Sequence, residues 1–518
     1  MKTLKLKQAI IAAVVGTQFV LPVFAAESAA TGTNGTAAVE IPAFAADGGS
    51  PAQEAEIKAL KQQVEALVEK VSALEQQRAP AEQAATIQNL DQQVRILQRQ
   101  REIDQDTATA KAATVPKVTL GANGFSFSSA DSNFVAQLHA VLQFDSRSFI
   151  HDNNAKGVDG FLLRRARPIL SGTVVRDFEY NFTPDFGGNQ VQIFDAYTIY
   201  HGAPWFQVEA GKFKPPVGLE ALQADVNLSF NERSLATDLV PNRDLGLALK
   251  GDLYGGVASY VVGIFNGASD YNSTVTNSYA QNNKSVDARL FFQPWKNSDV
   301  NALRGFGFGA GGSFENDNPA TNSTTGLTPG YTTDGQQKFF SYNKNVYADG
   351  VHWRLSPQAY YYYGPFGLLG EYAISDQHVS NDSAGGVKNV DVHNTAWEIA
   401  GSWLLTGEDA SYSGITPREN FDPRLNQWGA WQVVARYAEL NVDDDVFKGS
   451  NFNTSLASPK ASADSAQAWA LGLNWYLNKN VRANVSFSHT TFGGYTGSRT
   501  GVPAQAENVL FTRIQLAF

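Results

Sequence analysis

The feature that most constrains this sequence is a two-residue periodicity that recurs from about residue 117 to residue 518. Successive side chains of a β-strand point to opposite faces, so regular alternation predicts strands. In the stretch 134–147, alternating positions separate into a largely apolar face and a largely polar face. The apolar face holds Phe134, Ala136, Leu138, Ala140, Leu142 and Phe144, and the polar face holds Gln137, His139, Gln143, Asp145 and Arg147.

The same two-faced design recurs in "TAWEIAGSWLL", "WALGLNWYLN" and "VRANVSFSHT". A soluble β-sandwich also alternates, but its strands are short and their apolar face packs into a core. Here the strands run for about ten residues and carry aromatic residues near their ends, which is typical of a strand between lipid and water. We therefore predict an all-β transmembrane barrel, in which closure leaves no unpaired strand edge. About 20 to 25 residues per strand and connection give on the order of 16 antiparallel strands.

Both ends of the chain agree with export to an outer membrane. Residues 1–25 combine early lysines, an apolar run and a small-residue cleavage pattern, which predicts a signal peptide. A short membrane anchor is the disfavoured alternative, because Gln18 and Pro22 interrupt the run. The last strand, "LFTRIQLAF", ends in Phe518, and a terminal aromatic of this kind resembles the assembly signal of bacterial outer-membrane proteins. The exported chain has no cysteine, so disulfides contribute nothing to its stability.

The region before the barrel divides into three segments by composition. Residues 26–50 are rich in Ala, Gly, Ser and Thr and predict a flexible spacer. Residues 51–105 predict a coiled coil, because apolar residues recur at spacings of three and four. This seam comprises Ile57, Leu60, Val64, Leu67, Val71 and Leu74, and after a break at Pro80 it resumes with Ile87, Leu90, Val94 and Leu97. The alternative to a coiled coil is a single amphipathic helix whose apolar face packs on some other surface. Residues 106–116 predict a linker, and residues 117–518 the barrel.

No catalytic, cofactor or metal site is expected from the sequence. The seven histidines are scattered without the spacing of metal ligands. The stretch "GFGFGAGG" at 305–312 alternates glycine with larger residues, so it predicts a strand with a smooth face rather than a phosphate-binding loop. The formal net charge of -10 argues against a nucleic-acid partner. We therefore expect no enzyme activity and no cofactor.

The main chemical feature is "FLLRRARPIL" at 161–170, where three arginines stand among apolar residues. On a regular strand Arg165 and Arg167 share a face and Arg164 points away from it. All three can line the interior only if the strand contains a bulge or a bend. Two interpretations follow: one arginine extends to the membrane interface, or Arg164 and Arg165 meet at a narrow point of the channel.

The barrel region resembles the phosphate-selective porin O/P family. The resemblance runs from about residue 118 to residue 518 and is carried by motifs in the family's order. They are "FLLRRARPILSG", "QIFDAYTIY", "VEAGKFKPPVGLE" followed by "NERS", "SWLLTGE" and "LGLNWYLN". The resemblance implies a homotrimer of 16-stranded barrels. It also implies that a loop folds inward in each barrel and that basic residues bind anions at the constriction.

Carried over by motif, the anion-binding residues are Arg164, Arg165, Asp195 and Arg233. The guanidinium group matches the oxygens of phosphate bidentately, and desolvation strengthens that attraction. A carboxylate such as that of Asp195 can accept a proton from hydrogen phosphate, which chloride cannot offer. An ordinary ion pair between Asp195 and Arg233 is the alternative. Lys212 and Lys214 are possible accessory cations, although solvated residues at a strand end are the favoured interpretation.

Two departures from the family weaken the expectation of strict phosphate selectivity. Phosphate-specific members carry a ladder of arginines toward the channel mouth, whereas residues 313–351 contain only Lys338 and Lys344 as basic residues. The segment "ALQADVNLSFN" also lacks the lysine that those members place there. A modest anion preference or a broader range of solutes is therefore expected.

The resulting hypothesis is an outer-membrane porin that passes small hydrophilic solutes, with a preference for phosphate or similar inorganic anions. Its partners would be these solutes, outer-membrane lipid and two further copies of the chain. The coiled coil would lie in the periplasm, with possible contact to the cell wall. The alternatives are a general or weakly cation-tolerant diffusion porin, and a structural envelope tether that acts through the coiled coil.

Overall fold

The computed structural model describes residues 51–76, 80–112, 115–151, 157–188, 191–273, 284–317, 327, 330–449, 453–494 and 506–518. The predicted signal peptide and spacer, residues 1–25 and 26–50, lie outside the described residues. The chain divides into two compact units, residues 1–112 and residues 113–518.

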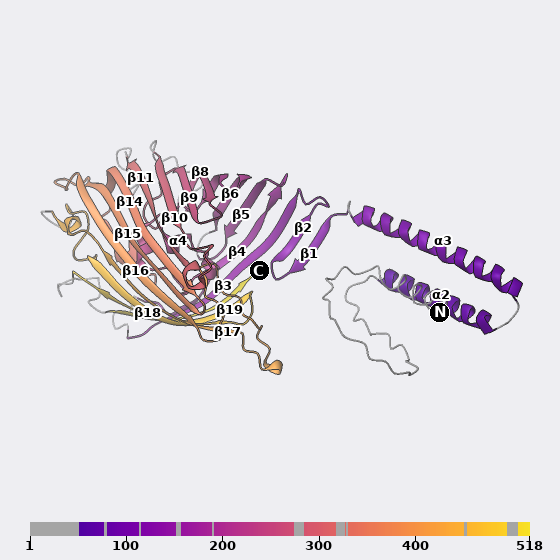
Figure 1. Ribbon diagram of the computed structural model, residues 1–518. Helices are drawn as coiled ribbons and strands as arrows, with labels where there is room; N and C mark the ends of the chain where they lie inside the picture. Colours follow the sequence, from indigo (N-terminus) through magenta and orange to yellow (C-terminus); the bar gives the residue numbers. More distant parts are fainter. Residues whose placement is uncertain are drawn as a thin grey trace. The chain divides into compact units, whose positions relative to one another are not determined.

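Sixteen antiparallel strands of the second unit form a closed barrel (Figure 1), which confirms the predicted barrel but not the predicted coiled coil. The first and last strands, β3 and β20, pair from Val509↔Phe149 to Ala517↔Val141 and so close the sheet. The strands are β3 (Val135–Phe149), β4 (Gly160–Val174), β5 (Phe178–Asp185), β6 (Gln192–Ala203), β7 (Phe206–Phe213), β8 (Asp244–Leu253), β9 (Ala258–Phe265), β10 (Ser285–Phe292), β11 (Phe306–Asp317), β14 (Val346–Tyr363), β15 (Phe366–Asn381), β16 (Val390–Leu404), β17 (Ala430–Asn441), β18 (Ser465–Tyr476), β19 (Val481–Phe492) and β20 (Glu507–Ala517).

Two short hairpins accompany the barrel. Strands β1 (Lys117–Gly121) and β2 (Gly124–Ser128) pair with each other, and β2 also pairs with the first residues of β3. Strands β12 (Tyr331–Thr332) and β13 (Lys338–Phe340) form a separate hairpin in the connection between β11 and β14.

The two faces of the barrel wall follow the sequence alternation. On β3, Leu142 and Phe144 are exposed on the outside, whereas Gln143 and Asp145 are fully buried on the inside. Aromatic side chains gather near the strand ends beside the short turns, as in the stacked pairs Phe366–Trp403 and Trp431–Trp475. An apolar outer face with aromatic side chains at its border is the pattern of a membrane-spanning barrel.

The connection between β7 and β8, residues 214–243, folds into the barrel and is called here the inner loop. It contains α4 (Leu219–Leu222), η1 (Asp225–Asn227) and η2 (Leu235–Leu239). On one side of the barrel, the Glu371 carboxylate on β15 accepts hydrogen bonds from the backbone N–H groups of Leu219 and Glu220, at 2.6 and 3.0 Å. The inner loop therefore begins against the β14–β15 wall.

A small apolar core fills part of the barrel interior. Side chains of the inner loop, of the β11–β14 connection and of the β17–β18 connection pack against β15 to β18. Its fully buried members include Val217, Leu235, Leu239, Tyr331, Phe340, Leu440 and Leu456. Tyr331, in the connection between β11 and β14, stacks on Phe340, and this aromatic pair contributes much of the apolar area that the connection brings to the core.

The described part of the first unit consists of two helices, α2 (Pro51–Gln76) and α3 (Pro80–Ala112). Helix α3 begins at Pro80, where the seam was predicted to break, and it includes residues 106–112 of the predicted linker. None of the described helices is both long and apolar enough to cross a membrane. Pairing of these helices between copies of the chain stays a prediction.

Glycines make the inner face of β11 smooth where the inner loop lies against it. A Cβ atom on Gly311 would lie less than 3.0 Å from the carbonyl oxygens of Val217 and Pro216. Gln358 on β14 donates a hydrogen bond to the Val217 carbonyl at 2.8 Å and holds the loop at this distance. The smooth strand face predicted for "GFGFGAGG" thus permits close approach of the loop backbone.

We expect Gly311→Val to destabilise the barrel by about 1–3 kcal/mol, because the new side chain forces the inner loop away from the wall. The midpoint temperature of unfolding of the purified protein in detergent measures this. Gly401→Val is the matched control, since a Cβ atom there meets no atom within 4 Å. An equal effect of the two substitutions would contradict the packing of the loop on β11.

Candidate functional site

Strand β4 contains a β-bulge at Arg164. Gln143 of β3 pairs with Arg165, but the next residue, Phe144, pairs with Leu163, so Arg164 is the extra residue. The bulge shifts the alternation by one position, and Arg164 joins Arg165 and Arg167 on the inner face. The bulge that the sequence analysis required is present.

Arg164 forms a bidentate ion pair with Glu232 of the inner loop. Its Nε lies 2.6 Å from Oε1 of Glu232, and its Nη2 lies 2.9 Å from Oε2. Arg147 on β3 donates to the same carboxylate at 2.9 Å. A guanidinium fork that meets both carboxylate oxygens is a strong and directional contact. Glu232 thereby fastens the inner loop to the wall formed by β3 and β4.

Asp225 of the inner loop is the second point of attachment. Its Oδ1 lies 2.6 Å from Nη1 of Arg233, and its Oδ2 lies 3.4 Å from Nε of Arg165. The Arg167 guanidinium also donates to Oδ2. Three arginines from the loop and the wall thus converge on one carboxylate that is only 6% exposed. Removal of this carboxylate would leave three cations close together in a desolvated place.

Among the residues that these ion pairs and two further ones join, arginines outnumber carboxylates. Further pairs join Arg513 to Asp145 at 2.6 Å and Arg167 to Asp185 at 2.6 Å. The cations are Arg147, Arg164, Arg165, Arg167, Arg233 and Arg513, and the carboxylates are Asp145, Asp185, Asp225 and Glu232. Within this set of ion-paired residues the arginines exceed the carboxylates by two, and exclusion of water strengthens the field of the unbalanced charges.

The two loop carboxylates stay ionised because of these arginines. Burial alone would raise the pKa of Asp225, but the charges of Arg165, Arg233 and Arg167 hold it well below its usual range. Burial likewise opposes ionisation of Glu232, and the Arg164 guanidinium overrides it and lowers the pKa of this carboxyl. The attachment of the inner loop is therefore ionic at neutral pH.

The structure brings Arg164, Arg165 and Arg233 together but separates Asp195 from them. Asp195 pairs with Arg243 at 3.2 Å, and its predicted partner Arg233 pairs with Asp225 instead. Among the three arginines, the side chain of Arg164 is 26% exposed and that of Arg165 only 4%. Arg164 thus has the most exposed side chain of the three.

The two lysines are placed differently from each other. Lys212 on β7 is buried, only 4% exposed. Lys214 donates hydrogen bonds to the carbonyl oxygens of Leu222 and Gln223, at 3.2 and 2.7 Å. Burial and the nearby charge of Arg233 hold the pKa of Lys214 well below its usual value. Lys214 therefore supports the backbone of the inner loop more than it offers a fixed positive charge.

Sequence reasoning missed Asp225, Glu232, Arg147 and Arg243 as members of this cluster. Glu232 stands beside Arg233 in the "NERS" motif, so its place in the chain was the available signal. Arg147 was assigned to the polar face of its strand, but no sequence pattern links it to residue 232. The contacts join residues that lie 48 to 85 positions apart in the sequence, and strand alternation alone cannot pair them.

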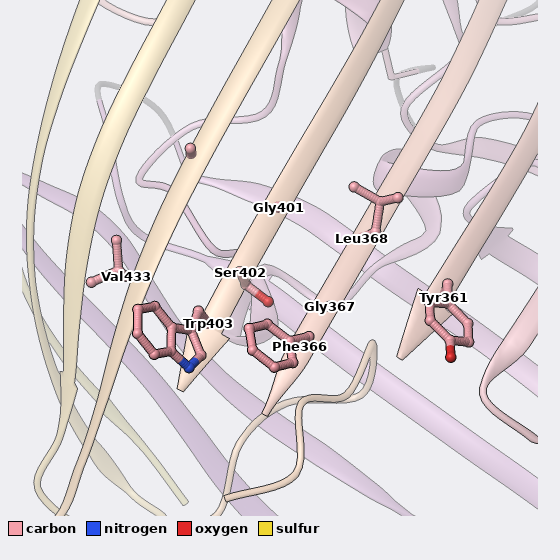
Figure 2. Close-up of a pocket in the computed structure, with 9 residues that line it drawn as sticks. Tyr361, Phe366, Gly367, Leu368, Gly401, Ser402, Trp403 and Val433 are labelled. Carbon is pink, nitrogen blue, oxygen red and sulfur yellow. The ribbon is translucent and has the colours of Figure 1, made fainter. Parts of the chain in front are cut away.

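An apolar groove lies on the outer wall, away from the arginines. Figure 2 shows it between side chains of neighbouring strands, with Phe366, Leu368 and Trp403 around Gly401. These three side chains are about half exposed on the lipid side of the barrel. The groove arises because Gly401 has no side chain, and it is not part of the solute path.

A closed barrel with an apolar outer face and a charged, loop-narrowed interior defines the class of outer-membrane porins. The family model "Phosphate-selective porin O and P" matches residues 137–518, so the chain belongs to this family and resides in the bacterial outer membrane.

Two comparisons with individual proteins accompany the family match. Porin O of Pseudomonas aeruginosa is 24% identical over 419 residues, which cover 74% of this chain and 88% of that relative. A solved structure of an anion-selective porin from Comamonas acidovorans is 11% identical, with a TM-score of 0.44, and covers 74% of this chain and 99% of its own.

Acid should loosen the inner loop. A carboxyl whose pKa is lowered in the folded state stabilises the protein above its unfolded pKa, about 3.9 for Asp, and loses this contribution as the pH falls further. We therefore expect the unfolding temperature to stay constant from neutral pH to about pH 5 and to fall below about pH 4.

Asp225→Asn should cost about 3–5 kcal/mol at neutral pH and reduce the decline in acid, because the carboxyl that titrates is gone. Thermal unfolding at a series of pH values measures both effects. Asp391→Asn is the control, since that carboxylate is exposed. If Asp225→Asn kept the full stability at neutral pH, the proposed attachment of the loop would be refuted.

Proposed function

We propose that this protein is a passive porin with a moderate preference for small inorganic anions such as phosphate. The observation that carries this proposal is that the guanidinium group of Arg164 is only partly occupied by hydrogen-bond partners. Glu232 occupies its Nε and Nη2, and no hydrogen bond joins its Nη1 to a described residue. An anion that reaches the cluster can bind this remaining donor, and the surplus of arginines favours its entry.

The preference should be moderate because most of the arginines already have partners. Arg233 donates to Asp225 and to the carbonyl oxygens of Glu220 and Gln223, so all its nitrogens are engaged. Arg165 is held by Asp225 and Gln143. In this proposal Arg165 and Arg233 position the inner loop and maintain the positive potential, and Arg164 makes the direct contact with the anion. Asp195 contributes as a hydrogen-bond acceptor beside the path, where its side chain is 21% exposed.

We further propose that the chain forms a homotrimer and that α2 and α3 lie in the periplasm. Several apolar seam residues of these helices are exposed in a single chain, among them Ile57, Leu60 and Ile87. An unpaired apolar stripe of this kind favours association with the same stripe of another copy. Attachment to a trimeric barrel would raise the effective concentration of three such helices.

Phosphate should block chloride current through the wild-type channel, and Arg164→Ala should weaken this block. Loss of one charge-assisted hydrogen bond corresponds to a rise of about tenfold or more in the phosphate concentration for half-block. Single-channel recording in a planar bilayer with added phosphate measures it. Arg424→Ala is the control, because the Arg424 side chain is 87% exposed and pairs with Asp422, next but one in the chain.

A second variant should change the strength of the phosphate block in the opposite direction from Arg164→Ala. Glu232→Gln frees Arg164 from its ionic partner and should tighten the phosphate block. A block of equal strength in the wild type and in both variants would exclude Arg164 as the anion contact. A channel that phosphate does not block at all would favour a general diffusion porin.

A further inference from the structure

One arginine and a group of aromatic side chains face the interior on the periplasmic side of the inner loop. Arg289 on β10 stands opposite Gly311, the residue of β11 against which the inner loop lies. From there β10 runs to its end at Phe292, on the side of the barrel where the turn at residues 364–365 joins β14 to β15. Because the short turns of outer-membrane barrels face the periplasm, a solute that enters from outside the cell meets this place after the inner loop.

The side chain of Arg289 forms no ion pair with any residue that the structure describes. Its Nε donates to Oε1 of Gln358 at 2.8 Å, and its guanidinium carbon lies 4.3 Å from the ring centre of Phe291. The carboxylate that acts on it electrostatically, Glu371, already accepts two backbone N–H groups of the inner loop. Arg289 therefore keeps more of its positive charge than the arginines that hold the inner loop, which are paired with carboxylates.

Gln358 determines which end of the Arg289 guanidinium remains for a ligand. The Gln358 amide nitrogen donates to the carbonyl oxygens of Val217 and Ser356, at 2.8 and 3.0 Å, so its oxygen is left to accept from Nε of Arg289. No hydrogen bond joins Nη1 or Nη2 of Arg289 to a described residue. These two donors lie in one plane and match the two oxygens of a carboxylate.

Four aromatic rings form a continuous group beside Arg289. Tyr360 of β14 lies against Phe291, with ring centres 5.0 Å apart, and stacks on Tyr412 of the β16–β17 connection at 5.5 Å. Tyr362 extends the group, 5.4 Å from Tyr360. The three tyrosine side chains are only partly buried, and Arg289 acts electrostatically on two of them, Tyr360 and Tyr412. Partly exposed ring surface beside a charged donor is typical of a ligand-binding surface.

Glycines of β11 give these rings their place on the wall. Gly307 stands opposite Tyr360, and a Cβ atom on Gly307 would lie 2.7 Å from the Phe291 ring and 2.9 Å from the Tyr360 ring. A Cβ atom on Gly309 would likewise lie 2.9 Å from the Phe291 ring. The absence of side chains at these positions lets the rings of β10 and β14 approach each other across β11. The aromatic group is therefore built into the wall and does not depend on the fold of the inner loop.

We propose that Arg289 and the adjoining rings bind organic anions that combine a carboxylate with a flat aromatic ring. The carboxylate meets Nη1 and Nη2 of Arg289, and the ring lies against Tyr360 or Tyr362, where offset or edge contacts between rings are favourable. Phosphate gains less at this surface, because ring faces donate no hydrogen bonds to its oxygens. The inference rests on the proposed function in that solutes pass through the barrel, but the site shares no residue with the arginine cluster at the inner loop.

The test is block of the chloride current by benzoate and by acetate in single-channel recordings of the full-length protein. Benzoate should block the wild-type channel at about a tenfold lower concentration than acetate, because acetate lacks the ring. Arg289→Gln should raise the benzoate concentration for half-block about tenfold or more, and Tyr360→Leu should bring it close to that of acetate. Arg304→Gln is the matched control, because this arginine of the β10–β11 connection is exposed and should leave the block unchanged.

Two further comparisons keep this test separate from that of the proposed function and from effects on folding. Arg164→Ala should leave the ratio of benzoate to acetate block unchanged, and a wild-type channel that phosphate does not block would refute the Arg164 contact without altering this ratio. Tyr360→Phe keeps the ring and should retain the ratio that Tyr360→Leu loses.

The comparison of benzoate with acetate in the wild-type channel needs no variant. Equal block by the two anions would overturn the proposal, as would a folded Arg289→Gln channel that benzoate blocks as strongly as the wild type.

Discussion

The structure depends on the ion pairs that fasten the inner loop to the wall of β3 and β4. Glu232 and Asp225 together engage Arg147, Arg164, Arg165, Arg167 and Arg233. These contacts decide where the loop crosses the interior and how much positive charge remains beside it. The loop carboxylates thus both position the arginines and neutralise part of their charge, so stability and anion preference oppose each other at this site.

The rest of the interior supports this arrangement from the opposite side. Glu371 accepts the backbone N–H groups at the start of α4, and the smooth face at Gly311 lets the loop approach β11. The Tyr412 hydroxyl, from the connection between β16 and β17, donates to the Leu219 carbonyl at 2.7 Å. The inner loop is therefore held between two walls, and its position does not rest on the arginines alone.

The sequence predicted the barrel well, because alternation reports directly on the two faces of each strand. It also predicted that Arg164 requires a bulge. It could not assign Asp225 and Glu232 to the arginines, nor pair Asp195 with Arg243, because those contacts depend on how a 30-residue connection folds within the barrel.

The most direct test of the account is the zero-current potential of the wild-type channel in a planar bilayer under a KCl gradient. The arginine surplus around the inner loop predicts a potential whose sign reports preferential passage of chloride over potassium. Added salt should weaken this selectivity, since mobile ions screen the exposed part of the cluster. A potential of the opposite sign, or no potential at all, would contradict the claim that these arginines determine which ions pass.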